Sequence, residues 1–183
     1  MLNWCRRKRQ SNTTPPFYIY CTGGAGVGKS HLINAVVQMA NRELRQPGDN
    51  PDDAIVIITA PTGTAAYNVS GCTLHSTFMM SAKSSDKLSA ERLTMLRNKY
   101  HKLVLVIIDE VSMVGANLLK RVHERFAAIR GLPSEHHSLE SAFLQWVTFS
   151  SSHLSENLPS TKHRGAATPV LLSYGCLTSR LSN

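Results

Sequence analysis

The sequence lacks the features that mark membrane and secreted proteins. No apolar run approaches the roughly 18 residues that a membrane-spanning helix needs, so we expect no membrane association. The N-terminal stretch MLNWCRRKRQ has a charged cluster with no apolar segment after it, which is unlike a secretory signal. We therefore expect an intracellular chain, nuclear in the first instance and mitochondrial as the alternative.

Cysteine and histidine are present, but not in metal-binding patterns. The four cysteines include no C-x-x-C pair, which argues against both a zinc site and a disulfide framework; they are Cys5, Cys21, Cys72 and Cys176. Reduced thiols in an intracellular protein are the simpler interpretation. Among the eight histidines, the adjacent pair His136-His137 has no partner at ligand spacing, so we expect no structural metal.

Negative charge is scarce. Lysine and arginine number 20 against 12 aspartates and glutamates, which gives a formal net charge of +8. This excess favours a polyanionic partner, because cations near phosphates release counterions and add sequence-independent affinity. We interpret the run Arg6-Arg7-Lys8-Arg9 as the solvated end of a helix, with a nuclear-import or DNA-contact patch as the alternative. Residues 1–14 are set apart as a basic N-terminal segment.

The sequence does contain a regular alternation of apolar runs and amphipathic segments. The apolar runs predict buried strands at residues 17–21, 54–60 and 103–108. The periodic segments predict helices at 30–44, 62–69, 73–80, 89–100 and 115–130, with a polar loop at 81–88. Strands that are apolar throughout and alternate with helices indicate an α/β fold with a parallel sheet covered on both faces. In the last helix we place Leu118, Val122, Phe126 and Ile129 on the buried face, and Lys120, Arg121, Glu124 and Arg125 outside it.

The first group of residues with recognisable chemistry follows the first strand. It reads Gly23-Gly24-Ala25-Gly26-Val27-Gly28-Lys29-Ser30 and fits the pattern G-x-x-x-x-G-K-[ST]. In such a P-loop, backbone N–H groups point at phosphate oxygens, and the N-terminus of the following helix adds positive potential. We expect Lys29 to reach the β- and γ-phosphates of ATP and the Ser30 hydroxyl to hold Mg²⁺. A chance glycine-rich turn is the alternative, but a strand directly before and a helix directly after favour nucleotide binding.

A second group, Asp109-Glu110, follows the third apolar strand. Ligands of open α/β sheets bind at the carboxyl ends of the strands, which is where this acidic pair is expected to lie. We expect Asp109 to complete the Mg²⁺ shell through water, and Glu110 to orient and deprotonate the water that attacks ATP. Acidic pairs at strand ends are common on surfaces, but the position of this one after a P-loop favours a hydrolase or motor.

Two further blocks complete a distinctive order of motifs. They are Ala60-Pro61-Thr62-Gly63-Thr64-Ala65-Ala66 and Gly71-Cys72-Thr73-Leu74-His75-Ser76-Thr77-Phe78, and they precede Asp109-Glu110-Val111-Ser112-Met113. Over residues 15–133 this order resembles helicases of the PIF (petite integration frequency) type, in the variant carried by Helitron transposons. The resemblance implies a RecA-like superfamily-one motor domain that uses ATP to move 5′→3′ on single-stranded DNA and unwind duplex. It implies single-stranded and forked DNA as partners.

The same resemblance implies that the two middle blocks face the DNA strand. Thr62, Gly63 and Thr64 can bind phosphate through hydroxyl and backbone groups, while His75 and Phe78 offer rings for base stacking. The alternatives are that Phe78 belongs to the core and that Thr62 caps a helix. The sequence leaves open the oligomeric state and the host process, whether transposition, telomere maintenance, repair or recombination.

Residues 134–183 depart from the pattern of the family. They are rich in serine, where the family has a block G-D-x-x-Q-L-P-P and then a second motor domain that supplies an arginine to the γ-phosphate. When the third base of each codon is read with the first two of the next, residues 145–155 permit V-G-D-L-F-Q-L-P-P-V. We therefore hypothesise a frame shift near Ser134, with a genuine serine-rich extension as the alternative.

This departure has consequences for folding and activity. In the family, the strand of the missing block lies between the P-loop strand and the Asp-Glu strand, so its loss leaves two unpaired edges in an incomplete sheet. We expect a poorly folded chain, unless residues 142–149 serve as a substitute strand. We also expect at best weak nucleotide binding and no unwinding by the chain alone. Another P-loop enzyme, such as an AAA-type ATPase or a kinase, and a non-enzymatic DNA-binding remnant are the alternatives.

Overall fold

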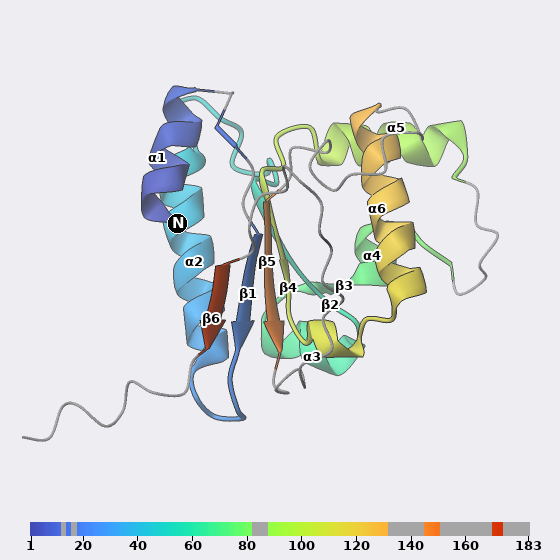
Figure 1. Ribbon diagram of the computed structural model, residues 1–183. Coiled ribbons are helices and arrows are strands. Elements are labelled where there is room, and N and C mark those ends of the chain that lie inside the picture. The colour runs from blue at the N-terminus through green and yellow to red at the C-terminus, as the bar shows by residue number, and fades with distance from the viewer. Residues whose placement is uncertain (12–13, 16–17, 82–87, 132–144, 151–169, 174–183) are drawn as a thin grey trace, which may run out of the picture.

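A parallel sheet organises the part of the chain that the computed structural model describes, namely residues 1–11, 14–15, 18–81, 88–131, 145–150 and 170–173. In these ranges six strands lie in the order β3-β2-β4-β5-β1-β6, and every pairing is parallel (Figure 1). The strands are β1 (Tyr18–Thr22), β2 (Val56–Ala60), β3 (Cys72–Thr73), β4 (Leu105–Ile108), β5 (Gln145–Ser150) and β6 (Val170–Ser173). The helices are α1 (Leu2–Gln10), α2 (Lys29–Leu44), α3 (Gly63–Asn68), α4 (Leu74–Thr77), α5 (Ala90–Lys99), the 3₁₀ turn η1 (Val111–Met113) and α6 (Ala116–Arg130).

Helices cover both faces of the sheet, as the uninterrupted apolar strands predicted. Strand β4 shows why: Leu105 and Ile107 are buried on the side of α1 and α2, while Val106 and Ile108 are buried on the side of α5 and α6. Alternate residues of a strand point to opposite faces, so a strand buried on both faces must be apolar at every position. Figure 1 shows α1 and α2 on one side of the sheet and α4, α5 and α6 on the other.

The predicted strands and helices are confirmed, with small changes at their ends. Each of the three predicted strands begins one or two residues later than expected. The helix predicted at 73–80 is shorter, because the two-residue strand β3, which the sequence did not predict, occupies its start and Met79 turns the chain at a positive φ of 49°. Of the loop predicted at 81–88, residues 82–87 lie outside the described part of the chain.

The buried face of α6 is wider than predicted. Val122, Phe126 and Ile129 are buried as expected, but Arg125, which was placed outside, is buried as well. These four positions follow the i, i+3, i+4, i+7 spacing of one helical face, so the face that packs inward includes the arginine. Its methylene stem can pack there as an apolar group.

The basic run of the N-terminal segment lies in α1. Trp4 and Cys5 are buried against α2, and the Trp4 indole donates a 2.8 Å hydrogen bond to the carbonyl oxygen of Pro15. Arg6, Arg7 and Arg9 are exposed around the rest of the helix, and Arg6 lies 3.5 Å from the Glu43 carboxylate. The run thus lies in the last turns of a helix with its three arginines exposed and Lys8 half-buried, and the import or DNA-contact patch stays a prediction.

The middle of the sheet is closed rather than open. Strand β5 pairs with β1 on one side and with β4 on the other, so the expected unpaired edges between them are absent. The substitute strand is confirmed for residues 145–149, whereas residues 142–144 lie outside the described part of the chain. A central parallel strand needs apolar side chains on its covered faces, and Val147 and Phe149 of β5 are buried. The stated reason for expecting a poorly folded chain is therefore wrong.

Candidate nucleotide-binding site

The P-loop joins β1 to α2 at the carboxyl edge of the sheet. Gly28 has a φ of 92°, a left-handed conformation that favours glycine, and it places Lys29 as the first residue of α2. The Lys29 ammonium donates hydrogen bonds to the carbonyl oxygens of Gly23 at 2.9 Å and Gly24 at 2.8 Å. The lysine thus lies folded over its own loop, at the position where phosphates are held in loops of this type.

Asp109 follows β4 and lies at the same edge. Its backbone N–H donates a 2.8 Å hydrogen bond to the carbonyl oxygen of Thr59, which extends the β2–β4 pairing by one residue. The side chain is only 7% exposed, and its Oδ1 atom is buried without a hydrogen-bond partner. Burial raises the pKa of this carboxyl above its ordinary value; the charge of Glu110 adds to the rise, while a backbone hydrogen bond and the charge of Lys29 oppose it.

Glu110 has a strained backbone. Its φ of 51° and ψ of 43° place it in the left-handed region, which residues with a Cβ rarely occupy. The residue stands directly before η1, so the chain turns sharply as it leaves β4. Such strain is concentrated at functional sites, where the surrounding structure holds the residue in place. Here it carries the side chain to the rim of the cavity described next.

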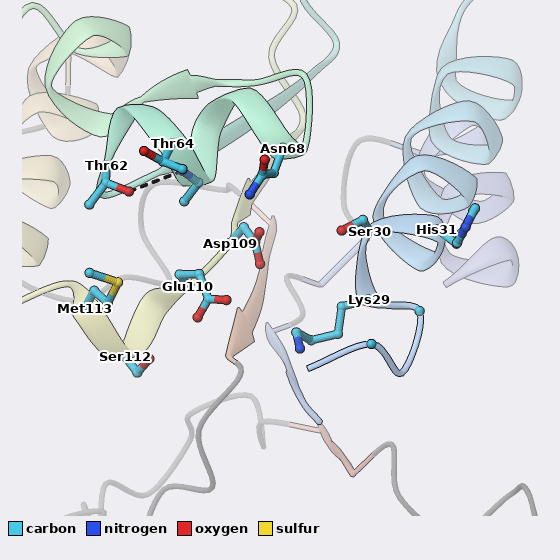
Figure 2. A pocket seen from close by; sticks show the side chains of 13 residues that line it. Lys29, Ser30, His31, Thr62, Thr64, Asn68, Asp109, Glu110, Ser112 and Met113 are labelled. Atoms are coloured by element: carbon cyan, nitrogen blue, oxygen red, sulfur yellow. Dashed lines mark hydrogen bonds between the residues drawn. The ribbon is translucent and has the colours of Figure 1, made fainter. Parts of the chain in front are cut away.

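These groups surround one cavity of about 670 Å³ (Figure 2). Figure 2 shows Lys29 and Ser30 from α2 on one side and Asp109 and Glu110 on the other, with α3 above them. The cavity is lined by Gly26, Gly28, Lys29, Ser30, His31, Thr62, Thr64, Ala65, Asn68, Asp109, Glu110, Ser112 and Met113. Cationic and hydroxyl groups thus face carboxylates across a space with room for a nucleotide triphosphate group.

The cavity also fits a divalent cation. Mg²⁺ prefers oxygen ligands, and the buried Oδ1 of Asp109 is an acceptor that no protein donor satisfies. The Ser30 hydroxyl lines the same cavity. A metal between these oxygens would satisfy the carboxylate and offset the cost of burying its charge.

Sequence analysis identified the P-loop and the acidic pair that face each other across the cavity, but it did not identify four other residues that line it. Asn68 lies four residues after Thr64 on α3, so helical spacing could have placed both on one face. Ser112 and Met113 follow Glu110 in a block already singled out, but sequence gives no sign that η1 turns them into the cavity. His31 lines the cavity because it belongs to the first turn of α2.

The threonines predicted to contact DNA lie beside the nucleotide cavity. Thr62 and Thr64 both line it, and Thr62 Oγ1 accepts a 3.2 Å hydrogen bond from the N–H of Ala65, so Thr62 does cap α3. Gly63 is exposed at the start of α3, and His75 is half-buried in α4, away from the cavity lining. For Thr62, Gly63, Thr64 and His75 the DNA role stays a prediction.

Phe78 is a core residue, and its predicted role in base stacking is wrong for this structure. The side chain is 0% exposed, and its ring packs against those of Phe126 at 4.6 Å and Tyr100 at 6.3 Å between centroids. A ring enclosed on both sides offers no face to a base. By contrast, Tyr67 on α3 is 85% exposed, and the sequence did not single it out.

Two negative findings apply to the described residues alone. No group of three or more histidine, cysteine, aspartate or glutamate side chains is placed to hold a metal ion among them. None of the helices in that part of the chain combines the length and apolar character needed to cross a bilayer.

Comparison with known proteins agrees with the site. Residues 9–138 match the sequence model of a family described as PIF1-like helicase. The chain belongs to this family. The match starts within α1 and includes the P-loop, both threonine-containing blocks and the acidic pair, and it ends before β5.

Individual relatives of the PIF1-like family support the assignment. The chain is 30% identical over 113 residues to the ATP-dependent DNA helicase Pif1 of Campylobacter jejuni, over 57% of this chain and 23% of that protein. It is 31% identical over 121 residues to the ATP-dependent DNA helicase PIF4 of Trypanosoma brucei, over 63% of this chain and 13% of that protein. Among solved structures, Bacteroides Pif1 bound to single-stranded DNA has a TM-score of 0.51 and 25% identity, over 82% of this chain and 32% of that one.

The fold is therefore the RecA-like P-loop fold of these helicases. The chain spans about a quarter or less of the two curated relatives and about a third of the solved structure. What those longer proteins do as a whole passes to this chain only as a proposal.

Proposed function

We propose that this chain is the nucleotide-binding part of an ATP-dependent DNA helicase. In the complete motor, ATP hydrolysis drives 5′→3′ movement along single-stranded DNA and the unwinding of forked duplex. By itself the chain binds MgATP weakly and does not unwind DNA. The observation that carries the proposal is the single cavity that joins Lys29 and Ser30 to Asp109 and Glu110.

Each residue of the cavity has a distinct task in this proposal. Lys29 releases the carbonyl oxygens of Gly23 and Gly24 and turns to the β- and γ-phosphates, which are stronger acceptors because they are charged. Ser30 and Asp109 are the residues that hold Mg²⁺, which supplies charge neutralisation at the phosphates. Glu110 orients the attacking water and accepts its proton.

For DNA, the proposal assigns base stacking to Tyr67 in place of Phe78. Its ring is 85% exposed on α3, the helix that also lines the nucleotide cavity through Thr64 and Asn68. Single-stranded DNA binds on exposed aromatic rings combined with positive charge, and the chain has a net charge of +8. Because α3 also lines the nucleotide cavity, a base stacked on Tyr67 would link the position of the DNA strand to the nucleotide that is bound.

The test is a titration of the full chain with a fluorescent ATP analogue and Mg²⁺. Lys29→Ala should weaken binding by at least about tenfold. The matched control is Lys120→Ala, because Lys120 is exposed on α6 and its weak 3.9 Å pair with Glu124 lies outside the cavity. Equal affinity of the two variants for the analogue would show that the cavity is not the nucleotide-binding site.

A second assay addresses DNA. Strand displacement by the chain alone should show no ATP-dependent unwinding, whereas single-stranded DNA binding should respond to MgATP. If neither nucleotide nor the Lys29→Ala substitution changes the affinity for DNA, the alternative of a non-enzymatic DNA-binding remnant is favoured. If single-stranded DNA does not change the rate of ATP hydrolysis by the complete protein, another class of P-loop enzyme is favoured.

A further inference from the structure

Strand β5 comes from the part of the chain beyond the family match, yet it occupies the centre of the nucleotide-binding edge. The match ends at residue 138, and β5 spans Gln145–Ser150. Its neighbours are β1, which leads into the P-loop, and β4, which leads into Asp109. Figure 1 shows β5 between these two strands. A segment with no matched motif therefore sets the spacing between the two halves of the site.

The last residue of β5 is bonded directly to the start of the P-loop. The N–H of Gly23 donates a 3.2 Å hydrogen bond to the carbonyl oxygen of Ser150. Gly23 is buried, so this bond satisfies a backbone donor that solvent does not reach. On its other side, the carbonyl oxygen of Gly23 accepts the 2.9 Å hydrogen bond from Lys29. One glycine thus links Ser150 to the lysine of the site.

Ser150 is fully buried at the end of β5. The residue is 0% exposed and stands opposite Thr22, the last residue of β1, in the parallel register. Val147 and Phe149 point to the α2 face of the sheet, so Thr148 and Ser150 point to the opposite face. We expect a larger side chain at this buried position to shift the backbone at the end of β5, where it meets the P-loop.

We infer that Ser150 is a positioning residue of the ATP site, whose main chain holds Gly23 so that the P-loop and Lys29 keep the geometry that phosphate requires. This inference rests on the proposed nucleotide-binding function. It assigns a task to residues 145–150 that differs from simply filling the sheet. If β5 only fills the sheet, disturbing it anywhere along its length should lower stability and leave the affinity of the folded chain for nucleotide unchanged.

Three variants of the full chain separate these two roles. Ser150→Leu overpacks the end of β5 beside Gly23 and should weaken binding of a fluorescent ATP analogue by about tenfold. Thr148→Leu makes a similar enlargement on the same face, about 7 Å back along the strand, and also removes the 3.3 Å hydrogen bond from Thr148 Oγ1 to the carbonyl oxygen of Ile19. It should lower the thermal midpoint by a similar amount and leave the affinity within about twofold of the parent chain. Lys120→Ala, a substitution of an exposed side chain on α6 outside the cavity, should bind as the parent does.

The outcomes are decisive in either direction. Unchanged affinity in Ser150→Leu, or equal loss in Thr148→Leu, would overturn the inference. Should Ser150→Leu not fold, amide hydrogen exchange of the parent chain takes its place: the Gly23 amide should exchange as slowly as amides within β1, and fast exchange would overturn the inference. A parent chain that binds no nucleotide at all, with a protected Gly23 amide, would instead count against the proposed function and leave the Ser150–Gly23 bond established.

Discussion

The rings of Phe78 and Phe126 meet edge to face, 4.6 Å apart between centroids with their planes at 65°. The contact joins the end of the T-L-H-S block to the middle of α6, within the core cluster on that side of the sheet. Aromatic pairs in this geometry add stability beyond the area that they bury. Phe78 therefore anchors the T-L-H-S block to the core by packing on Phe126, so it contributes to stability rather than to DNA contact.

Phe78→Leu should destabilise the fold without affecting DNA affinity. The substitution keeps an apolar side chain but loses the ring contact, so we expect a loss of about 1–1.5 kcal/mol in the free energy of unfolding. Urea denaturation measures the loss, and fluorescence anisotropy with labelled single-stranded DNA measures the affinity. A weaker affinity in a variant that is fully folded would restore the stacking role.

Tyr67→Ala should have the opposite profile. Its ring is 85% exposed, so its removal should leave stability within about 0.5 kcal/mol, while single-stranded DNA binding should weaken by about 1 kcal/mol or more. Tyr67→Phe keeps the ring and should restore binding. Met95→Ala is the matched control, because Met95 is also an exposed apolar residue, 58% exposed, on α5. Equal losses in Tyr67→Ala and Met95→Ala would show that exposed apolar area alone is responsible.

Glu110 should be a site where function costs stability. Its left-handed backbone, at a φ of 51°, is strained for any residue with a Cβ but not for glycine. We expect Glu110→Gly to be more stable than Glu110→Ala by about 1 kcal/mol, the reverse of the usual ranking. Thermal denaturation of the two variants at one pH provides the comparison. The usual order, with alanine more stable, would mean that Glu110 does not hold this conformation in solution.

Removal of the Asp109 charge should separate folding from metal binding. Asp109→Asn keeps the shape but removes a carboxylate whose Oδ1 is buried without a hydrogen-bond partner, so the metal-free chain should become more stable. The same variant should lose most of the thermal stabilisation that MgATP gives the parent chain, because stabilisation by a ligand follows its affinity for the folded state. Thermal scans in EDTA and in MgATP test both halves. A variant that MgATP stabilises as strongly as the parent would exclude Asp109 from the metal site.

Gly71 should tolerate no side chain. A Cβ at this position would lie 2.6 Å from the carbonyl oxygen of Ile58, a backbone atom of β2 that cannot move aside. Gly71→Ala should therefore destabilise the chain by about 1–3 kcal/mol. Gly63→Ala is a suitable control, since a Cβ there meets nothing within 4 Å. The thermal midpoints of the two variants measure this difference. The same scans show whether the parent chain unfolds in one cooperative transition, which would contradict the expectation of a poorly folded protein.

The frame-shift hypothesis is tested at the level of nucleic acid. Transcript and genomic sequence across codons 130–160 should show a second frame that encodes G-D-L-F-Q-L-P-P. If no frame encodes that string, the serine-rich segment belongs to the protein. In the chain with the present sequence, residues 145–150 have a place in the sheet, because β5 pairs with β1 and β4.

The order of motifs along the chain determined the family, the fold class and the two ends of the nucleotide site. Gly23–Ser30 and Asp109-Glu110 each lie directly after an apolar strand, and parallel strands bring their carboxyl ends to one edge of the sheet. Local pattern was sufficient here because the chemistry is confined to residues close in sequence. The same pattern could not decide between core and surface for Phe78, nor for Arg125, because an aromatic ring or a long stem can occupy either environment.

Tertiary structure decided how the two motifs are joined. The apolar residues 142–149 suggested a substitute strand, but nothing in the sequence fixes its register or predicts that Ser150 bonds Gly23, since this contact and the pairing with β1 join residues more than 120 positions apart. The left-handed turn at Glu110, the unsatisfied oxygen of Asp109 and the exposure of Tyr67 are likewise properties of packing. They arise because each side chain takes the position that its neighbours in space leave open, and sequence order does not list those neighbours.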